Sequence, residues 1–329
     1  MLFDLLQQAR NLKASDVHLQ AGCAPNLRVQ GYLKKLPAPI MTQEQLAGVL
    51  RSVLTEAAWE KLLRLGEVDA ACSDSAGRRY RLNAYRQSGR YALAVRLLES
   101  TIPSCEELGL PANVQRLAEL EQGLVLVVGA TGSGKSTTLA ALVQCMNRER
   151  ALHIITLEDP IEYVYPQGQA FISQREVGRD TESFASGLRS ALRQDPDVIL
   201  VGELRDSETM AIALTAAETG HLVLATLHTQ DAVSSVNRIL DTLPERSAQV
   251  RSQLAEVLQA VVCQRLLPKA DGEGRIAAFE VLVATEALRN IIREGRTHQL
   301  ESYIQTGRRF GMMTMADAIV ELRKSGVIK

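Results

Sequence analysis

The chain has 329 residues, of which 46% are hydrophobic and 23% are charged, and its formal net charge is −1. This composition is ordinary for a folded globular protein and excludes a disordered or a collagen-like chain. The charge balance lacks the basic surplus of nucleic-acid-binding proteins, so we expect no direct nucleic-acid partner. No stretch approaches 18 consecutive apolar residues and residues 1–13 lack a signal-peptide core, so we expect a cytosolic protein without a membrane span.

The five cysteines are scattered along the chain and form no C-x-x-C pair. This spacing argues against a disulfide framework and against a zinc site, so we expect no zinc. Reduced, mostly buried thiols are the ordinary interpretation.

The first hundred residues predict an α+β domain. Apolar residues at helical spacing indicate a helix, and alternating residues indicate strands. The expected elements are a helix over residues 2–12, strands over 17–20 and 26–36 (the second turning at Gly31), a helix from Thr42 to Gly66, and a hairpin of 79–85 with 91–98. Thr42 with Gln45 forms a capping box at the start of the second helix, and Gly66 is a typical helix end.

Prolines 103 and 111 mark a linker over residues 101–111, with a hinge near 99–111. Residues 1–100 carry 14 Lys+Arg and 9 Asp+Glu, whereas residues 101–329 carry 23 and 29. We therefore expect a basic N-terminal domain to face an acidic C-terminal one, within a chain or between subunits.

Beyond the linker, apolar runs alternate with helical segments. The expected strands are 124–128, 153–157, 198–201 and 222–225, and the expected helices are 135–147, 181–193 and 207–219. Such alternation predicts a mostly parallel, doubly wound α/β sheet. The last hundred residues are predicted to be helical, except for a strand pair near 263–268 and 275–283.

A glycine-rich loop lies between the first of these strands and its helix. It fits the pattern G-x-x-x-x-G-K-[ST], and we assign nucleotide binding to Gly129, Ala130, Thr131, Gly132, Ser133, Gly134, Lys135, Ser136 and Thr137. The glycines let backbone N–H groups turn toward phosphate oxygens. Lys135 is expected to reach the β- and γ-phosphates, and the Ser136 hydroxyl to bind Mg²⁺.

Carboxylates follow two of the other strands. Glu203 comes directly after strand 198–201 and is placed to orient an attacking water; a helix-capping acid is the alternative. Glu158, Asp159 and Glu162 follow strand 153–157 and could share Mg²⁺ or a water; a solvated acidic turn is the alternative.

Two histidines flank the apolar run 222–225. His221 precedes it and His228 follows it, and a polar residue after a strand end is placed to sense a γ-phosphate. A structural role is the alternative for each. No third ligand is spaced to make them a metal site.

Together with residues 192–206, these motifs resemble the traffic ATPases of type II secretion and type IV pili. The resemblance implies a RecA-like P-loop NTPase domain over 112–329, with a helical C-terminal part, and a PAS-like α+β domain over 1–100. It identifies the loop as Walker A, 158–162 as the Asp box, Glu203 as the end of an atypical Walker B and 221–228 as the His box. Gly202 stands where an Asp usually holds the metal, which leaves the second Mg²⁺ contact open among the carboxylates of the Asp box.

Residues 14–19 and 287–294 resemble segments of pilus-retraction ATPases. The resemblance implies a homohexameric motor that hydrolyses ATP with Mg²⁺ to power pilus retraction. It also implies a location at the inner face of the cytoplasmic membrane and an inner-membrane pilus platform protein as partner. Residues Arg289–Glu294 form an Arg/Glu face on an amphipathic helix that can dock on this partner; ordinary solvation is the alternative. An accessory ATPase for secretion or DNA uptake, a pilus-assembly ATPase, a nucleotide kinase and an inactive scaffold are the alternatives.

An arginine-rich stretch without acidic residues covers the predicted hairpin. Its arginines are Arg78, Arg79, Arg81, Arg86, Arg90 and Arg96. By resemblance, Arg81 and Arg96 close onto the triphosphate and act as catalytic residues, and the other four are surface residues. A solvated basic hairpin is the alternative.

Overall fold

The computed structural model describes residues 2–98, 101–243 and 247–329, and the chain divides into two compact units. The first unit comprises Met1–Thr101 together with Pro160–Val164, and the second comprises Ile102–Asp159 and Tyr165–Lys329. The five-residue return to the first unit has no signal in the sequence. Residues 99–100 of the predicted hinge lie outside the described residues.

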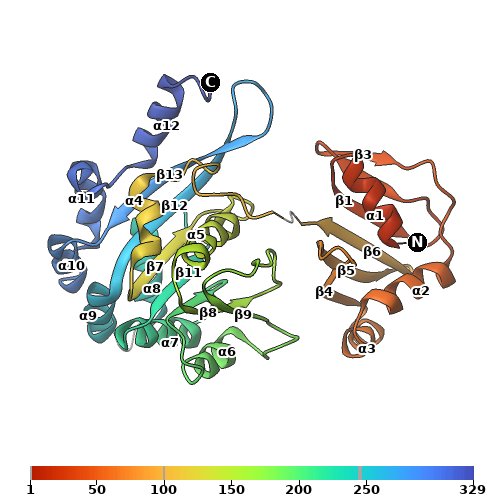
Figure 1. Ribbon diagram of the computed structural model, residues 1–329, viewed down its shortest axis with the longest axis horizontal. Helices are drawn as coiled ribbons and strands as arrows, with labels where there is room; N and C mark the ends of the chain where they lie inside the picture. Colours follow the sequence, from red (N-terminus) through yellow and green to blue (C-terminus); the bar gives the residue numbers. More distant parts are fainter. Residues whose placement is uncertain (1, 99–100, 244–246) are drawn as a thin grey trace. The chain divides into compact units, whose positions relative to one another are not determined.

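The first unit is an antiparallel sheet with helices packed on one face (Figure 1). Over the described residues its six strands have the order β3-β2-β1-β6-β5-β4. The strands are β1 (Ala14–Gln20), β2 (Asn26–Val29), β3 (Tyr32–Lys35), β4 (Glu67–Ser73), β5 (Arg79–Gln87) and β6 (Arg90–Leu97). The helices are α1 (Leu2–Asn11), α2 (Gln43–Val53) and α3 (Glu56–Leu65). The predicted α+β architecture is confirmed.

The predicted helix from Thr42 to Gly66 is two helices. The capping box of Thr42 and Gln45 and the left-handed Gly66 mark its outer ends as predicted. Leu54 is extended, and the Thr55 hydroxyl accepts a hydrogen bond from Ala58 N to begin α3. The single-helix prediction was wrong because a second N-cap lies within it.

The second unit is a seven-stranded sheet of described residues, in the order β13-β12-β7-β11-β10-β8-β9. All neighbouring strands are parallel except β12 and β13. The strands are β7 (Gly123–Val128), β8 (His153–Glu158), β9 (Phe171–Glu176), β10 (Val198–Val201), β11 (Leu222–Leu227), β12 (Leu258–Pro268) and β13 (Arg275–Val283). The α/β class is confirmed, and β9 was not predicted.

Helices and short 3₁₀ turns surround this sheet. They are α4 (Ala112–Gln115), η1 (Arg116–Glu119), α5 (Lys135–Glu149), α6 (Phe184–Ala191), α7 (Ser207–Glu218), α8 (Ala232–Thr242), α9 (Ser247–Val257), α10 (Glu286–Arg293), η3 (Thr297–Gln299), α11 (Leu300–Thr306), η4 (Arg308–Phe310) and α12 (Met315–Lys324). None of the described helices is long and apolar enough to span a membrane.

The sheet is buried on both faces, which explains the uninterrupted apolar strands. In β7, Leu124 and Leu126 join a core beneath α6 to α10, whereas Val125 and Val127 join a core beneath α5. Cys105 and Leu110, within the predicted linker, belong to this second core. Parallel strands buried on both faces bring their carboxyl ends to one edge, where ligands usually bind.

Candidate nucleotide-binding site

The loop of residues 129–134 joins the carboxyl end of β7 to the start of α5. Gly134 is the N-cap of α5, in the left-handed conformation with φ +91°, and makes no side-chain cap hydrogen bond. The first backbone N–H groups of a helix have no partner within the helix. This turn therefore presents N–H donors and a positive helix end to an anion.

The glycines let this loop lie directly against β12. A Cβ atom on Gly129 would lie 2.4 Å from Gln264 O and 2.7 Å from Ser133 Oγ. A Cβ atom on Gly134 would lie 2.7 Å from Gln264 Nε2. The motif glycines are therefore required by packing as well as by the backbone conformation.

Two polar side chains of the loop are buried in a way that fits phosphate. Lys135 Nζ donates to Gly129 O at 2.8 Å and to Ala130 O at 3.1 Å, and the side chain is buried. Ser133 Oγ is buried and has no hydrogen-bond partner among the described residues; a buried hydroxyl left unpaired typically costs about 1–3 kcal/mol. Phosphate oxygens would accept hydrogen bonds from both groups, so the residues fit a triphosphate.

A cavity of about 500 Å³ opens beside the loop. Its walls are residues 129–133 and Gln230, Gln264, Arg265, Leu266, Arg275 and Met315. Arg265 and Arg275 add positive charge, as an anionic ligand requires. The polar pair Gln264 and Arg265 interrupts the apolar run of β12 that begins at Ala260, and this interruption is the signal from which the sequence could have assigned these residues.

Glu203 lies at the centre of a polar network at the carboxyl edge of the sheet. Its Oε2 accepts a hydrogen bond from Arg205 Nε at 2.7 Å, and its Oε1 lies 3.1 Å from His228 Nε2. The opposite ring atom, Nδ1, lies within hydrogen-bond distance of Thr131 Oγ1, at 3.4 Å. The network therefore joins the glycine loop to Glu203.

The backbone on both sides of Glu203 is fixed to β11. The Thr226 hydroxyl donates to Gly202 O, and Leu204 N donates to Thr226 O at 3.0 Å. A Cβ atom at Gly202 would lie 3.1 Å from Leu157 O, so a larger residue would crowd β8. This crowding is a physical reason why position 202 holds a glycine, where other P-loop proteins usually have the Asp that holds the metal.

The Asp box is divided between the two units. Asp159 Oδ2 lies 3.8 Å from Arg205 Nη1, at the end of the Glu203 network. Glu158 Oε1 accepts from Thr156 Oγ1 at 2.6 Å and from Gln174 Nε2 at 3.2 Å. Glu162 belongs to the segment 160–164 of the first unit.

His221 is not brought to this edge. It precedes β11, and its Nδ1 lies 3.0 Å from Ala216 O and 3.2 Å from Thr219 Oγ1. The six residues of β11 separate it from His228 by about 20 Å. His221 thus lies at the opposite end of β11 from His228, and its catalytic role stays a prediction.

Arg81 and Arg96 lie directly opposite each other on β5 and β6 of the first unit. Like charges at such a position destabilise a sheet. Arg96 Nε donates to Asp16 Oδ1 at 3.0 Å. Burial acts to raise the pKa of the Asp16 carboxyl, but hydrogen bonds from Ser15 and Arg96 outweigh it and hold that pKa below its usual value. Arg81 and Arg96 carry two positive charges and Asp16 carries one negative charge, so this part of the sheet keeps a net positive charge that can attract an anion.

Arg289, predicted as part of a contact surface, points inward instead. Its side chain is 15% exposed, and Nη1 donates to Ala255 O at 2.6 Å and to Glu256 O. It therefore binds the last carbonyl groups of α9, as a cation at a helix C-terminus does. Asn290 and Arg293 remain exposed on α10.

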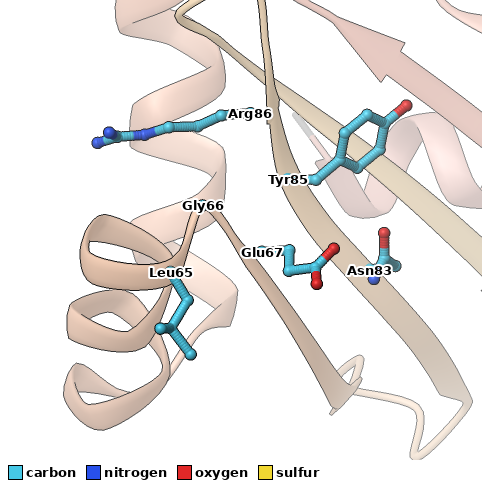
Figure 2. Close-up of a pocket in the computed structure, with 6 residues that line it drawn as sticks. All are labelled: Leu65, Gly66, Glu67, Asn83, Tyr85 and Arg86. Carbon is cyan, nitrogen blue, oxygen red and sulfur yellow. The ribbon is translucent and has the colours of Figure 1, made fainter.

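Figure 2 shows a second hollow, of about 420 Å³, within the first unit where α3 ends and β4 begins. The side chains of Tyr85 and Arg86 point to opposite sides of β5 (Figure 2), and Asn83 Nδ2 donates to Asp69 Oδ1 at 3.2 Å. The described residues that line this hollow include none of the predicted site, so we assign it no part in nucleotide binding.

Comparison with known proteins places these features in a family. The family described as "Type II/IV secretion system protein" matches residues 1–325. The chain belongs to this family. The predicted resemblance is confirmed, and it covers both units.

Individual relatives match over nearly the whole chain. "Uncharacterized protein YggR" of Escherichia coli is 50% identical over 91% of each chain. "Type IV pilus retractation ATPase PilT" of Pseudomonas aeruginosa is 43% identical, over 99% of this chain and 94% of its own. A solved structure, "Crystal Structure of the Pilus Retraction Motor PilT and Bound ADP", is 44% identical with a TM-score of 0.92, over 99% of this chain and 94% of that one.

Proposed function

We propose that this chain is an ATP-hydrolysing hexameric motor that powers retraction of type IV pili. The observation that carries the proposal is the network from Thr131 of the glycine loop through His228 to Glu203. It links the phosphate-binding loop to a carboxylate suited to orient water. The names of the PilT relatives, a retraction ATPase and a motor with bound ADP, support this function.

In the proposed reaction, the phosphates replace the Gly129 and Ala130 carbonyls as partners of Lys135. Glu203 accepts a hydrogen bond from the attacking water, with Glu162 as an alternative or a helper. His228 relays the presence of the γ-phosphate from Thr131 to Glu203. The loop residues bind and orient the nucleotide, and removing such positioned donors typically costs about 10²–10³ in rate.

Mg²⁺, when bound, neutralises charge on the β- and γ-oxygens. We assign the Ser136 hydroxyl as its direct ligand, because Ser136 is exposed on the first turn of α5. Glu158 is the last residue of β8 and Asp159 follows it, three strands from β7, or about 14 Å at a usual strand spacing. We therefore assign them contacts through water.

Arg81 and Arg96 complete the proposed site by closing onto the phosphates when the two units move together. An arginine supplied in this way is worth roughly 10³–10⁵ in rate in other NTPases. We further propose that the hexamer lies at the inner face of the cytoplasmic membrane and acts on the inner-membrane platform of the pilus, and that residues 99–111 form the hinge.

Steady-state ATPase assays of the full chain test the enzymatic part. We expect Lys135→Ala and Glu203→Gln to lower kcat at least about 10²-fold, while Glu301→Gln, an exposed glutamate on α11, leaves it unchanged. Steady hydrolysis by Lys135→Ala at the wild-type rate would refute the proposal.

Time-lapse microscopy of surface pili tests the cellular part. A deletion strain should carry abundant pili that do not shorten, and wild type but not Glu203→Gln should restore shortening. Loss of pili would assign the chain to assembly, and normal pili would assign it to a secretion or DNA-uptake machine.

A further inference from the structure

The segment 160–164 ties the two units together a second time. The chain passes from the first unit to the second after Thr101, returns to the first at Pro160 and leaves it again after Val164. Asp159 and Tyr165, on either side, belong to the second unit. We call residues 160–164 the strap. Two of the acidic residues assigned to the site lie here: Asp159 directly precedes the strap, and Glu162 is part of it.

Arg79 holds the strap within the first unit. Its Nε and Nη2 both donate to Ile161 O, at 3.3 and 3.1 Å, and Nη1 donates to Ser73 Oγ at 3.4 Å. Arg79 is only 8% exposed. A buried guanidinium that gives two N–H groups to one backbone carbonyl fixes the position of that peptide and its direction.

The side chains of the strap alternate as in an extended segment. Ile161 and Tyr163 are each 9% exposed, whereas Glu162 is half-buried and Val164 is exposed. Alternation places Glu162 on the side opposite Ile161 and Tyr163. Arg79 therefore sets which way Glu162 is directed.

The two ends of the strap are joined on the second unit. Gln174 of β9 donates through Nε2 to Glu158 Oε1 at 3.2 Å, and its Oε1 accepts from Tyr165 N at 3.3 Å. One side chain thus holds Glu158, two residues before the strap, and Tyr165, the residue after it. The strap has its ends fixed to one unit and its middle fixed to the other.

We propose that Arg79 is a positioning residue, which through Ile161 holds the strap and thereby sets where Asp159 and Glu162 stand during hydrolysis. The proposal rests on the proposed function, because it requires these carboxylates to serve ATP hydrolysis. Movement of the first unit then moves the strap, and with it the acidic residues, without any further contact. Arg79, predicted as a surface residue, is instead buried against the strap within the first unit.

The test compares Arg79→Ala and Arg79→Lys with Arg86→Ala, an exposed arginine on the same strand. For each full-length variant we would measure kcat and KM for ATP, the Kd for ADP, and hydrogen exchange over residues 159–165. We expect Arg79→Ala to lower kcat about tenfold and to speed exchange in the strap about tenfold, with the Kd for ADP within about twofold of wild type. Arg79→Lys should give a kcat and an exchange rate between those of Arg79→Ala and wild type, because an ammonium is a point charge and lacks the planar array of N–H donors of a guanidinium. Arg86→Ala should match wild type.

Three results would overturn the proposal: unchanged exchange in the strap, unchanged kcat despite faster exchange, or faster exchange spread over the whole first unit. Gln174→Ala gives a second readout if Arg79→Ala does not fold, since loss of the joined ends should also lower kcat with ADP binding retained. Lys135→Ala separates the two proposals. If it abolishes hydrolysis while the Arg79 and Gln174 variants behave as wild type, only the strap proposal fails.

Discussion

A hydrogen bond between α5 and β12 fixes the glycine loop, and its removal has a calculable cost. Thr138 Oγ1 donates to Gln264 Oε1 at 2.7 Å, and the two residues are 1% and 6% exposed. Gln264→Leu keeps the volume and leaves the Thr138 hydroxyl buried without this acceptor, which costs about 1–3 kcal/mol. At about 2–4 °C per kcal/mol for a unit of this size, the Tm should fall by roughly 2–12 °C.

A double-mutant cycle decides whether this hydrogen bond is the cause. Thr138→Val should destabilise by a similar amount, because it leaves Gln264 Oε1 without this donor. The double variant removes both polar groups, so it should be more stable than the sum of the single effects predicts, by at least about 1 kcal/mol. Calorimetry and far-UV circular dichroism give the Tm values. Additivity within about 0.5 kcal/mol would refute the reasoning.

Three further predictions follow from particular contacts. Gly129→Ala places a Cβ atom 2.4 Å from a backbone oxygen of β12, so the loop must shift and ATP affinity should fall at least about tenfold in titration calorimetry. Arg289→Ala removes hydrogen bonds to the last carbonyls of α9 and should destabilise the second unit by about 1.5–3 kcal/mol in thermal unfolding, with only partial rescue by Arg289→Lys. Burial acts to raise the pKa of the Asp74 carboxyl, but donors including Tyr80 OH at 2.9 Å outweigh it and lower that pKa. Asp74 therefore stabilises the first unit above the usual aspartate pKa, and this stabilisation is lost as the pH falls through the lowered value. Tyr80→Phe should raise the pKa and move the acid midpoint of Trp59 fluorescence to higher pH.

Each of these has a contrary outcome. Wild-type ATP affinity in Gly129→Ala would mean that the loop does not need its contact with β12. An unchanged Tm in Arg289→Ala would show that α9 ends without help from that guanidinium. An acid midpoint that stays in place, or moves to lower pH, in Tyr80→Phe would contradict the hydrogen-bond account of the Asp74 pKa.

Prediction was best for apolar runs bounded by polar turns, both for β10, which is buried on both faces, and for the edge strand β13, whose predicted bounds match the structure. Residues 198–201 were predicted without error, because a short β-branched run between polar turns has no other economical interpretation. The edge strands β4 and β9 were missed, since their residues are only partly buried and show no clean alternation. The strand β12 begins five residues before the predicted 263, because an apolar run after a helix does not show where the helix ends.

The sequence could predict those site residues that come shortly after the carboxyl end of a buried strand. The glycine loop follows β7, Glu203 follows β10 and His228 follows β11. His221 precedes β11 and lies at the other end of that strand from His228, so its catalytic role stays a prediction. Arg79 and Gln264 contact partners that are distant in the chain, Ile161 and Thr138, and such contacts leave no periodic signal in the sequence.

Burial makes the thiols of this protein unequal. It raises the pKa of the Cys72 and Cys105 thiols to about 11, raises that of Cys145, and raises that of Cys263 well above the usual range. Cys23, in the turn after β1, is the exposed one among the five. Thiolate-selective reagents at neutral pH should therefore label the wild-type chain at one position. A single dye or spin label on the first unit would then report its movement during nucleotide turnover without any cysteine being removed.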